Sequence, residues 1–162
     1  MKRTLLATLL ALACAHSAAL AAPPAPSDLA FDEVMKHYMI LHGHLTNDRF
    51  DDASRKTAAA MNDACSALAR TASTPAAAQA AVKLMTDRSA ELTKAGLPAV
   101  RKIYANLGDG VDPYIKNFYK GTVKYWRFFC DMQKKPWAQL QMKPLLNPFY
   151  DKTMRDCGRL VP

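Results

Sequence analysis

Apolar residues recur every three or four positions in the first half of the chain. The clearest run consists of Phe31, Val34, Tyr38, Leu41 and Leu45. This spacing places all five side chains on one face of an α-helix and leaves the opposite face to polar residues. Helices of this kind bury their apolar faces against one another, so the run predicts a helical domain.

The same period continues along the chain. We expect helices over residues 28–46, 49–70, 75–94, 99–107 and 113–129. The tripeptide Gly108-Asp109-Gly110 has the composition of a loop between the last two. The sequence contains neither a period-two strand pattern nor an internal repeat. The predicted fold class is therefore all-α: an up-and-down helical bundle of about four main helices, with a C-terminal Cys/Met segment and a short helix capping one end.

The first 21 residues have the composition of a cleaved secretory signal. Lys2 and Arg3 precede an apolar run, and residues 19–21 (ALA) form a small-x-small cleavage site. The apolar run is too short to span a bilayer, and no later transmembrane segment is predicted. We therefore expect export to the periplasm. Cys14, which follows Leu-Ala, leaves a lipoprotein as the alternative.

The rest of the chain is expected to form one domain. Residues 22–27 (APPAPS) are a proline-rich leader, and residues 28–162 are long enough for a single core. Within this domain, the segment 125–158 has the most unusual composition.

Basic residues concentrate toward the C-terminus. The chain has 22 Lys and Arg against 14 Asp and Glu, and residues 114–162 hold ten of the basic and three of the acidic ones. Four basic residues recur at helical spacing: Lys116, Lys120, Lys124 and Arg127. The stripe is either a solvated helix face or a docking surface for an acidic periplasmic protein or anionic headgroups. No nucleic-acid partner is expected, because a recognition motif is missing from the sequence.

Two pairs of sulfur side chains lie in the segment 125–158, Cys130 with Met132 and Met154 with Cys157. Thiolate and thioether ligands select Cu(I), or a comparably soft ion such as Ag(I), over hard cations. The four sulfurs are therefore a candidate metal site. A disulfide between Cys130 and Cys157 is the alternative, because exported thiols tend to oxidise. Both methionines would then be ordinary packing residues.

The residues around the second pair predict how it is presented. Asn147 is a good N-cap, Pro148 suits the first helical position, and Gly158 suits the residue after a helix end. We therefore expect a short helix over residues 148–157, with both sulfurs of the pair on one face. The sulfurs of the first pair are two residues apart, so they lie on one side only in extended or turning chain. The preceding helix should therefore end near Phe129.

The motifs FFCDM, PWAQL, LNPFYDKTM and CG resemble the signature of a bacterial domain-of-unknown-function family. The family pattern is Cys-Pro-Met-Ala, Trp-Leu, Asn-Pro-Tyr-Tyr-Gly and Met-x-x-Cys-Gly. Its members are periplasmic helical domains, found alone or fused to membrane-fusion adaptors of copper and heavy-metal efflux pumps. The resemblance covers about 35 residues and carries over nine positions: Cys130, Met132, Trp137, Asn147, Pro148, Tyr150, Met154, Cys157 and Gly158.

The resemblance implies a role in copper handling, with a heavy-metal efflux adaptor as a partner. This chain departs from the pattern at three positions: Asp131 replaces proline, Ala138 replaces leucine and Asp151 replaces glycine. Without the proline at position 131, we expect a looser turn between Cys130 and Met132, the first sulfur pair.

Three side chains of the first helix form a second candidate. Met35, Met39 and His42 fall on one side of that helix and are soft or borderline ligands. An ordinary helix flank is the alternative. Cys65 is expected to be a buried core residue and is not assigned to a site. Trp137 is expected to pack in the core or to cover the metal with its ring.

The sequence offers no catalytic motif. It lacks the CxxCH haem motif, a nucleophile elbow and a phosphate-binding glycine loop, and it has no histidine after His44 to act as a base. We therefore expect a protein that is not an enzyme. Two functions remain: a periplasmic Cu(I) or Ag(I) binding accessory protein linked to efflux or tolerance, and a disulfide-stapled helical interaction domain without a metal.

Overall fold

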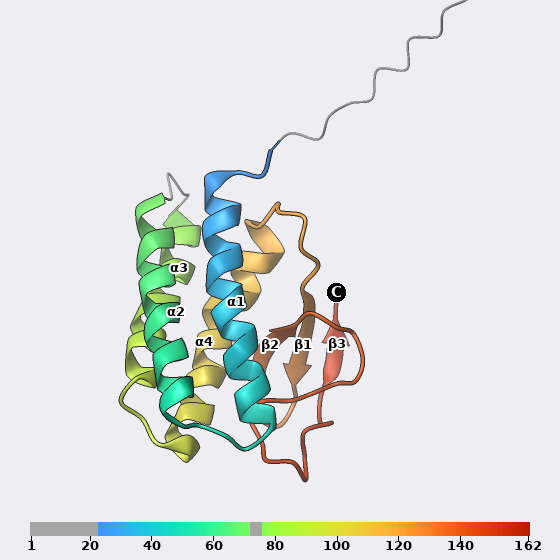
Figure 1. Cartoon of the computed structure of the whole chain (residues 1–162). Helices are drawn as coiled ribbons and strands as arrows, with labels where there is room; N and C mark the ends of the chain where they lie inside the picture. The colour runs from blue at the N-terminus through green and yellow to red at the C-terminus, as the bar shows by residue number, and fades with distance from the viewer. Residues whose placement is uncertain (1–22, 72–75) are drawn as a thin grey trace, which may run out of the picture.

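The computed structural model describes residues 23–71 and 76–162. Four helices dominate this part of the chain: α1 (Pro26–Thr46), α2 (Asp52–Thr71), α3 (Ala76–Leu92) and α4 (Leu97–Asn117). Three short strands follow: β1 (Trp126–Cys130), β2 (Lys135–Gln139) and β3 (Arg159–Val161). The helices stand side by side as a bundle, and the strands lie beside α1 and α4, away from α2 and α3 (Figure 1). The helical bundle confirms the coarser prediction, but the sheet shows that the fold is not all-α.

The periodic apolar residues form the core as predicted. All five that defined the first helix are fully buried in α1. Helix α1 begins at Pro26, which has no N–H to leave unpaired in the first turn. Helix α2 follows a reciprocal cap, in which the Ser54 amide donates to Asp51 Oδ1 at 2.9 Å and the Asp51 amide donates to Ser54 Oγ at 3.2 Å. The first two helices therefore form for the reasons visible in the sequence.

The prediction of a loop at residues 108–110 is wrong, because α4 runs through it without a break. Both glycines serve close packing. A Cβ on Gly108 would collide with the carbonyl oxygen of Pro136 on β2, and a Cβ on Gly110 would lie 2.8 Å from the carbonyl oxygen of Ala81 on α3. Glycine here lets α4 approach two neighbours at once, at a cost in helix propensity.

The predicted helix over residues 113–129 is also wrong. Helix α4 ends at Asn117, a loop covers residues 118–125, and the chain then forms β1. The loop is held on α1 by Asp32, whose Oδ1 accepts hydrogen bonds of 2.7 Å from the hydroxyls of Tyr119 and Tyr125. The next residues, WRFFC, are rich in aromatics, which favour a half-buried strand.

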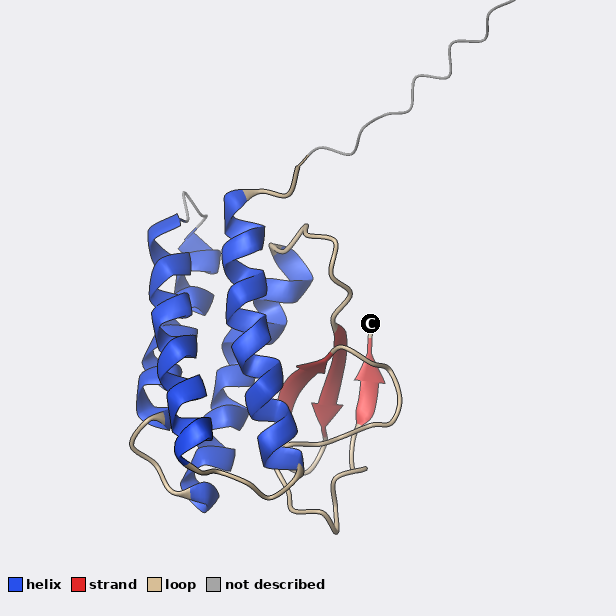
Figure 2. Ribbon diagram, in the orientation of Figure 1, coloured by secondary structure: helices blue, strands red, loops and turns tan. Residues whose placement is uncertain are grey.

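The strands form an antiparallel sheet in the order β2-β1-β3 (Figure 2). In this register Phe128 lies opposite Trp137 on one side and Leu160 on the other. The rings of Phe128 and Trp137 stack with centroids 5.2 Å apart. Because β1 is the central strand, Cys130 at its end has a fixed position.

The predicted signal segment, residues 1–21 with Cys14, lies outside the described residues. Within residues 23–71 and 76–162, no helix has the length and apolar character needed to cross a bilayer.

Candidate metal centre

The centre begins where β1 ends. Cys130 is fully buried at the last position of the strand, and the chain then turns through residues 131–134 into β2. The amide of Gln133 donates to Cys130 Sγ at 3.4 Å. The first sulfur pair therefore follows a strand rather than a helix, with Cys130 in extended chain and Met132 in the turn; extended or turning chain was the prediction.

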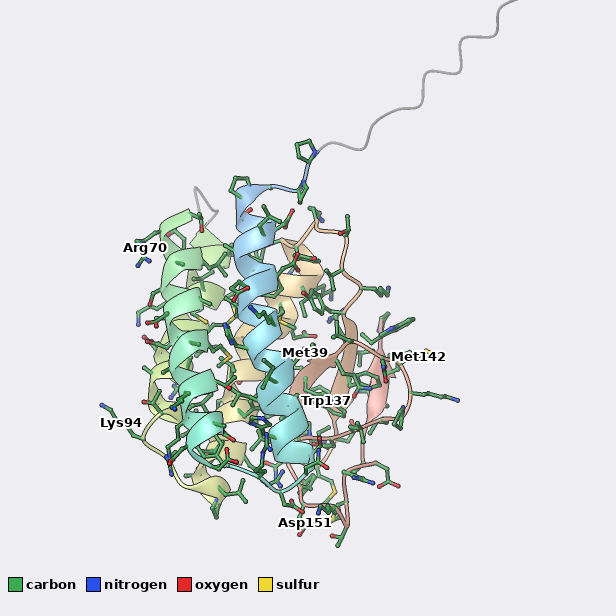
Figure 3. The ribbon with its side chains drawn as sticks, in the orientation of Figure 1. Met39, Arg70, Lys94, Trp137, Met142 and Asp151 are labelled. Atoms are coloured by element: carbon green, nitrogen blue, oxygen red, sulfur yellow. The ribbon has the colours of Figure 1, made fainter. Side chains whose placement is uncertain are left out.

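The loop over residues 147–157 supplies the second cysteine. It consists of turns, so the predicted helix over residues 148–157 is wrong. Asn147 is fully buried and closes the loop: its Oδ1 accepts the Phe149 amide at 2.9 Å, and its Nδ2 donates to the Cys157 carbonyl at 2.7 Å. One side chain thus caps the start of the loop and holds its end. Asp151, a loop residue, lies below Trp137 at one end of the molecule (Figure 3).

Three of the four predicted sulfurs come together. Cys157 Sγ lies 3.6 Å from Met132 Sδ. Partial burial raises the pKa of the Cys157 thiol, and interaction with the free thiol of Cys130 adds to the rise. Met154 contributes its backbone, since its carbonyl accepts the Cys157 amide at 3.3 Å. Its side chain is 37% exposed at the rim.

Tyr150 is partly buried against the core and interacts with both thiols. Burial raises the pKa of its hydroxyl, and the adjacent Cys130 and Cys157 side chains add to the rise, whereas a hydrogen bond with Gln133 opposes it. The carboxylates of Asp131 and Asp156 also contribute to the raised pKa of Cys157. Asp131, which replaces the family's proline, is itself paired with Arg159 at 3.3 Å.

Trp137 packs in the core beside this region. It is fully buried between Phe128 and Phe149, whose ring meets it edge-on at 5.7 Å. Gly158 has a φ of +139°, and a Cβ there would collide with the Trp137 ring. Glycine is therefore required directly after Cys157 for both conformation and space.

Sequence reasoning missed Arg101, on the first turns of α4. Its Nη1 donates to the carbonyls of Pro148 at 2.7 Å and Tyr150 at 2.5 Å. Its Nη2 donates to the Leu45 carbonyl at 2.9 Å and to Asp48 Oδ1 at 2.5 Å. The acceptors lie 47 to 56 residues away in sequence, so no local pattern could have indicated this contact.

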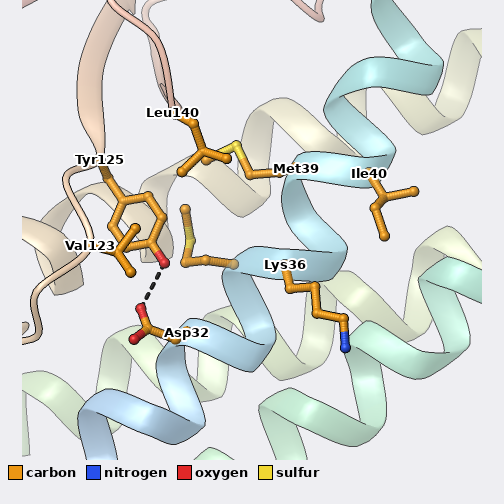
Figure 4. A pocket seen from close by; sticks show the side chains of 8 residues that line it. Asp32, Lys36, Met39, Ile40, Val123, Tyr125 and Leu140 are labelled. Carbon is orange, nitrogen blue, oxygen red and sulfur yellow. Dashed lines mark hydrogen bonds between the residues drawn. The ribbon is translucent and has the colours of Figure 1, made fainter. Parts of the chain in front are cut away.

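The second candidate site is not assembled. Met35 is fully buried in the core, and His42 Nε2 lies 2.7 Å from the Leu146 carbonyl, so this nitrogen carries a proton and donates it. Burial lowers the pKa of His42 to about 4. Met35 and Met39 instead line an apolar pocket of about 460 Å³ between α1 and the loops at Val123 and Leu140 (Figure 4).

The predicted basic stripe is not a helical stripe. Lys116 lies in the last turn of α4, Lys120 and Lys124 lie in the next loop, and Arg127 lies on β1. Arg127 is paired with Asp112, with Nε 2.7 Å from Oδ1. The four side chains therefore do not share one helix face.

All three cysteines of the described residues are free: Cys65, Cys130 and Cys157. Cys65 is buried in α2, and burial raises the pKa of its thiol to about 12. Among residues 23–71 and 76–162, no three His, Cys, Asp or Glu side chains are grouped to hold a metal. A metal at this centre therefore needs the thioether of Met132 in addition to the two cysteines.

Comparison with models of known families, with curated proteins and with solved structures finds no match for this chain. The resemblance of segment 125–158 to the efflux-associated family stays a prediction.

Proposed function

We propose that the protein binds a soft monovalent metal ion, Cu(I) or Ag(I), through Cys130, Cys157 and Met132. The observation that carries this proposal is the 3.6 Å approach of Cys157 Sγ to Met132 Sδ beside Cys130. Two thiols and a thioether are the donor set that soft ions prefer. Metal binding displaces the thiol protons, so affinity rises with pH.

The exposure of the sulfurs supports a role in metal transfer. Met132 is 61% exposed and Met154 is 37% exposed, whereas Cys130 is fully buried. An ion arriving from solvent or from a partner meets a weak thioether first and passes inward to the thiols by ligand exchange. The reverse path releases it. This gradient suits an accessory protein that captures and delivers its cargo.

The cellular setting that we propose follows from the sequence. The signal-like segment over residues 1–21 supports export to the periplasm, and the family resemblance supports a link to copper or heavy-metal efflux. The partner would be an efflux adaptor or another acidic periplasmic protein, since residues 114–162 are strongly basic. The role is binding and delivery rather than catalysis.

A metal titration tests the proposal. Reduced protein is titrated with Ag(I), and with Cu(I) in competition with a chromophoric chelator, and the complex is weighed by native mass spectrometry. We expect one ion per chain, lost in the Cys130→Ser, Cys157→Ser double variant and kept in the control Cys65→Ser. Equal affinity of the double variant and the wild type would overturn the proposal.

Cys130 and Cys157 are free thiols that are not at disulfide distance in the structure, but they interact at the same centre, so a disulfide-stapled interaction domain is the alternative function. Closing a loop of this length would stabilise the fold by about 3.5 kcal/mol in the chain-entropy model. A protein purified from the periplasm under air that has lost two hydrogens and melts at a lower temperature with reductant would support the staple, and a failure to bind Ag(I) after reduction would exclude the metal role.

A further inference from the structure

The guanidinium of Arg101 joins three segments that are distant in sequence. Two of its four acceptors, the carbonyls of Pro148 and Tyr150, belong to the loop that ends at Cys157. The other two are the Leu45 carbonyl, at the C-terminal end of α1, and Asp48 Oδ1, in the turn that follows α1. The side chain of Arg101 is only 12% exposed, so these contacts are shielded from water.

Asp48 reinforces this junction from the other side. Its Oδ1 accepts Arg101, and its Oδ2 accepts the Lys152 amide at 3.4 Å. His42 on α1 adds a contact to the Leu146 carbonyl at 2.7 Å, just before the loop begins. The loop has no helix or strand of its own. Asn147 closes it internally, and the contacts with Arg101, Asp48 and His42 fix its backbone against α1 and α4.

The position of this loop decides whether Cys130 is covered. Cys130 is fully buried, and two side chains of the loop reach this region: the Phe149 ring meets the Trp137 ring edge-on, and Tyr150 interacts with the Cys130 thiol. The same loop carries Cys157 to Met132. If the loop moved away, Cys130 would become accessible and the three sulfurs would separate.

We propose that Arg101 is the positioning residue of the sulfur centre, holding the loop over residues 147–157 so that Cys157 meets Cys130 and Met132. The part of this proposal that concerns metal affinity rests on the proposed function. The part that concerns the loop does not. Arg101 does not touch the sulfurs; it acts through the carbonyls that it binds.

Peptide-resolved alkylation of the reduced protein with N-ethylmaleimide tests the loop. Cys130 reports opening of the loop, and Cys65, buried in the helical core, reports global unfolding in the same sample. We expect Arg101→Gln to raise the alkylation rate of Cys130 by at least about 10-fold and to leave the rate of Cys65 unchanged. Equal acceleration at both cysteines, or at neither, would overturn the proposal.

Two further variants separate the effect of the Arg101 contacts from those of charge and of arginine removal in general. Arg101→Lys keeps the charge, but its compact ammonium cannot reproduce the planar fork, so Cys130 should still react faster than in the wild type. Arg55→Gln is the matched control, because Arg55 Nη1 also bonds a carbonyl, that of Ala95 at 2.9 Å, without touching the loop. It should change neither rate. If Arg101→Gln does not fold, the result with Arg101→Lys decides.

Ag(I) titration of the same variants tests the metal part. We expect Arg101→Gln to weaken Ag(I) binding by roughly 10- to 100-fold, as loss of an outer-shell partner does at other metal sites. Unchanged Ag(I) affinity alongside faster Cys130 alkylation would show that the loop does not set the site. A wild-type protein that binds no Ag(I) would refute the proposed function, and the alkylation result would still decide the role of Arg101.

Discussion

Cys157 Sγ and Met132 Sδ lie 3.6 Å apart, although 25 residues separate them in the chain. Neither residue is in a helix or a strand. Their meeting depends on the rigid elements around them, namely β1 and β2 on one side and the clamped loop over residues 147–157 on the other. The geometry of the centre is therefore a property of the tertiary fold.

Replacing Met132 by leucine should weaken metal binding without affecting the fold. The side chain is 61% exposed, so leucine fits, but the soft thioether ligand is lost. We expect Ag(I) affinity to fall by at least roughly 10-fold, comparable to the loss of an outer-shell partner. Met142→Leu, at another exposed methionine, is the control and should bind as the wild type does. Equal affinities for the two variants would exclude Met132 as a ligand.

Asn147→Ala should lower both stability and metal affinity. It removes the hydrogen bonds to the Phe149 amide and the Cys157 carbonyl from a fully buried position, at a cost of about 2–3 kcal/mol in the free energy of unfolding. Urea unfolding and Ag(I) competition measure the two effects.

The control for Asn147 is Asn62→Ala. Asn62 Nδ2 also donates two hydrogen bonds, to the Thr86 carbonyl and to Ser89 Oγ, both at 3.0 Å, but it lies between α2 and α3. It should lose stability and keep its Ag(I) affinity. A loss of affinity in both variants would mean that affinity follows global stability alone.

The helices that were predicted well are those whose apolar period is long. The expected spans 28–46, 49–70 and 75–94 are close to α1, α2 and α3. The sheet was missed because its strands have five, five and three residues, too few for a period of two to be distinct. At Gly108 and Gly110, composition indicated a turn where the fold uses glycine for close contact.

The sequence predicted residues of the candidate site better than the secondary structure that holds them. Asn147 does accept a backbone amide two residues on, as a cap does, but the same side chain also holds the Cys157 carbonyl. That second bond turns the chain back and prevents the expected helix. Arg101 could not be assigned, because three of its four partners are distant carbonyls that any residue could supply, and the fourth, Asp48, is 53 residues away.

Gly158→Ala should destabilise the fold. The φ of +139° is unfavourable for alanine, and its Cβ would collide with the Trp137 ring, so we expect a loss of about 2 kcal/mol or more in unfolding free energy. Gly43→Ala is the matched control: its Cβ meets nothing within 4 Å, and alanine in α1 should stabilise by about 0.5–1 kcal/mol. Two small effects of the same sign would contradict the close packing at Gly158.

His42 should make stability depend on pH. Burial lowers its pKa to about 4 in the fold, below the ordinary value of 6.5, so the unfolded chain binds the proton more readily between these two values. His42 therefore contributes stability that is fully present above pH 6.5 and is lost as pH falls toward 4, amounting to about 3 kcal/mol.

His42→Gln can still donate to the Leu146 carbonyl but does not titrate. Urea unfolding from pH 7.5 to 4 should show the wild type losing about 3 kcal/mol more than this variant. Parallel curves for the wild type and His42→Gln would show that His42 is not held neutral in the fold.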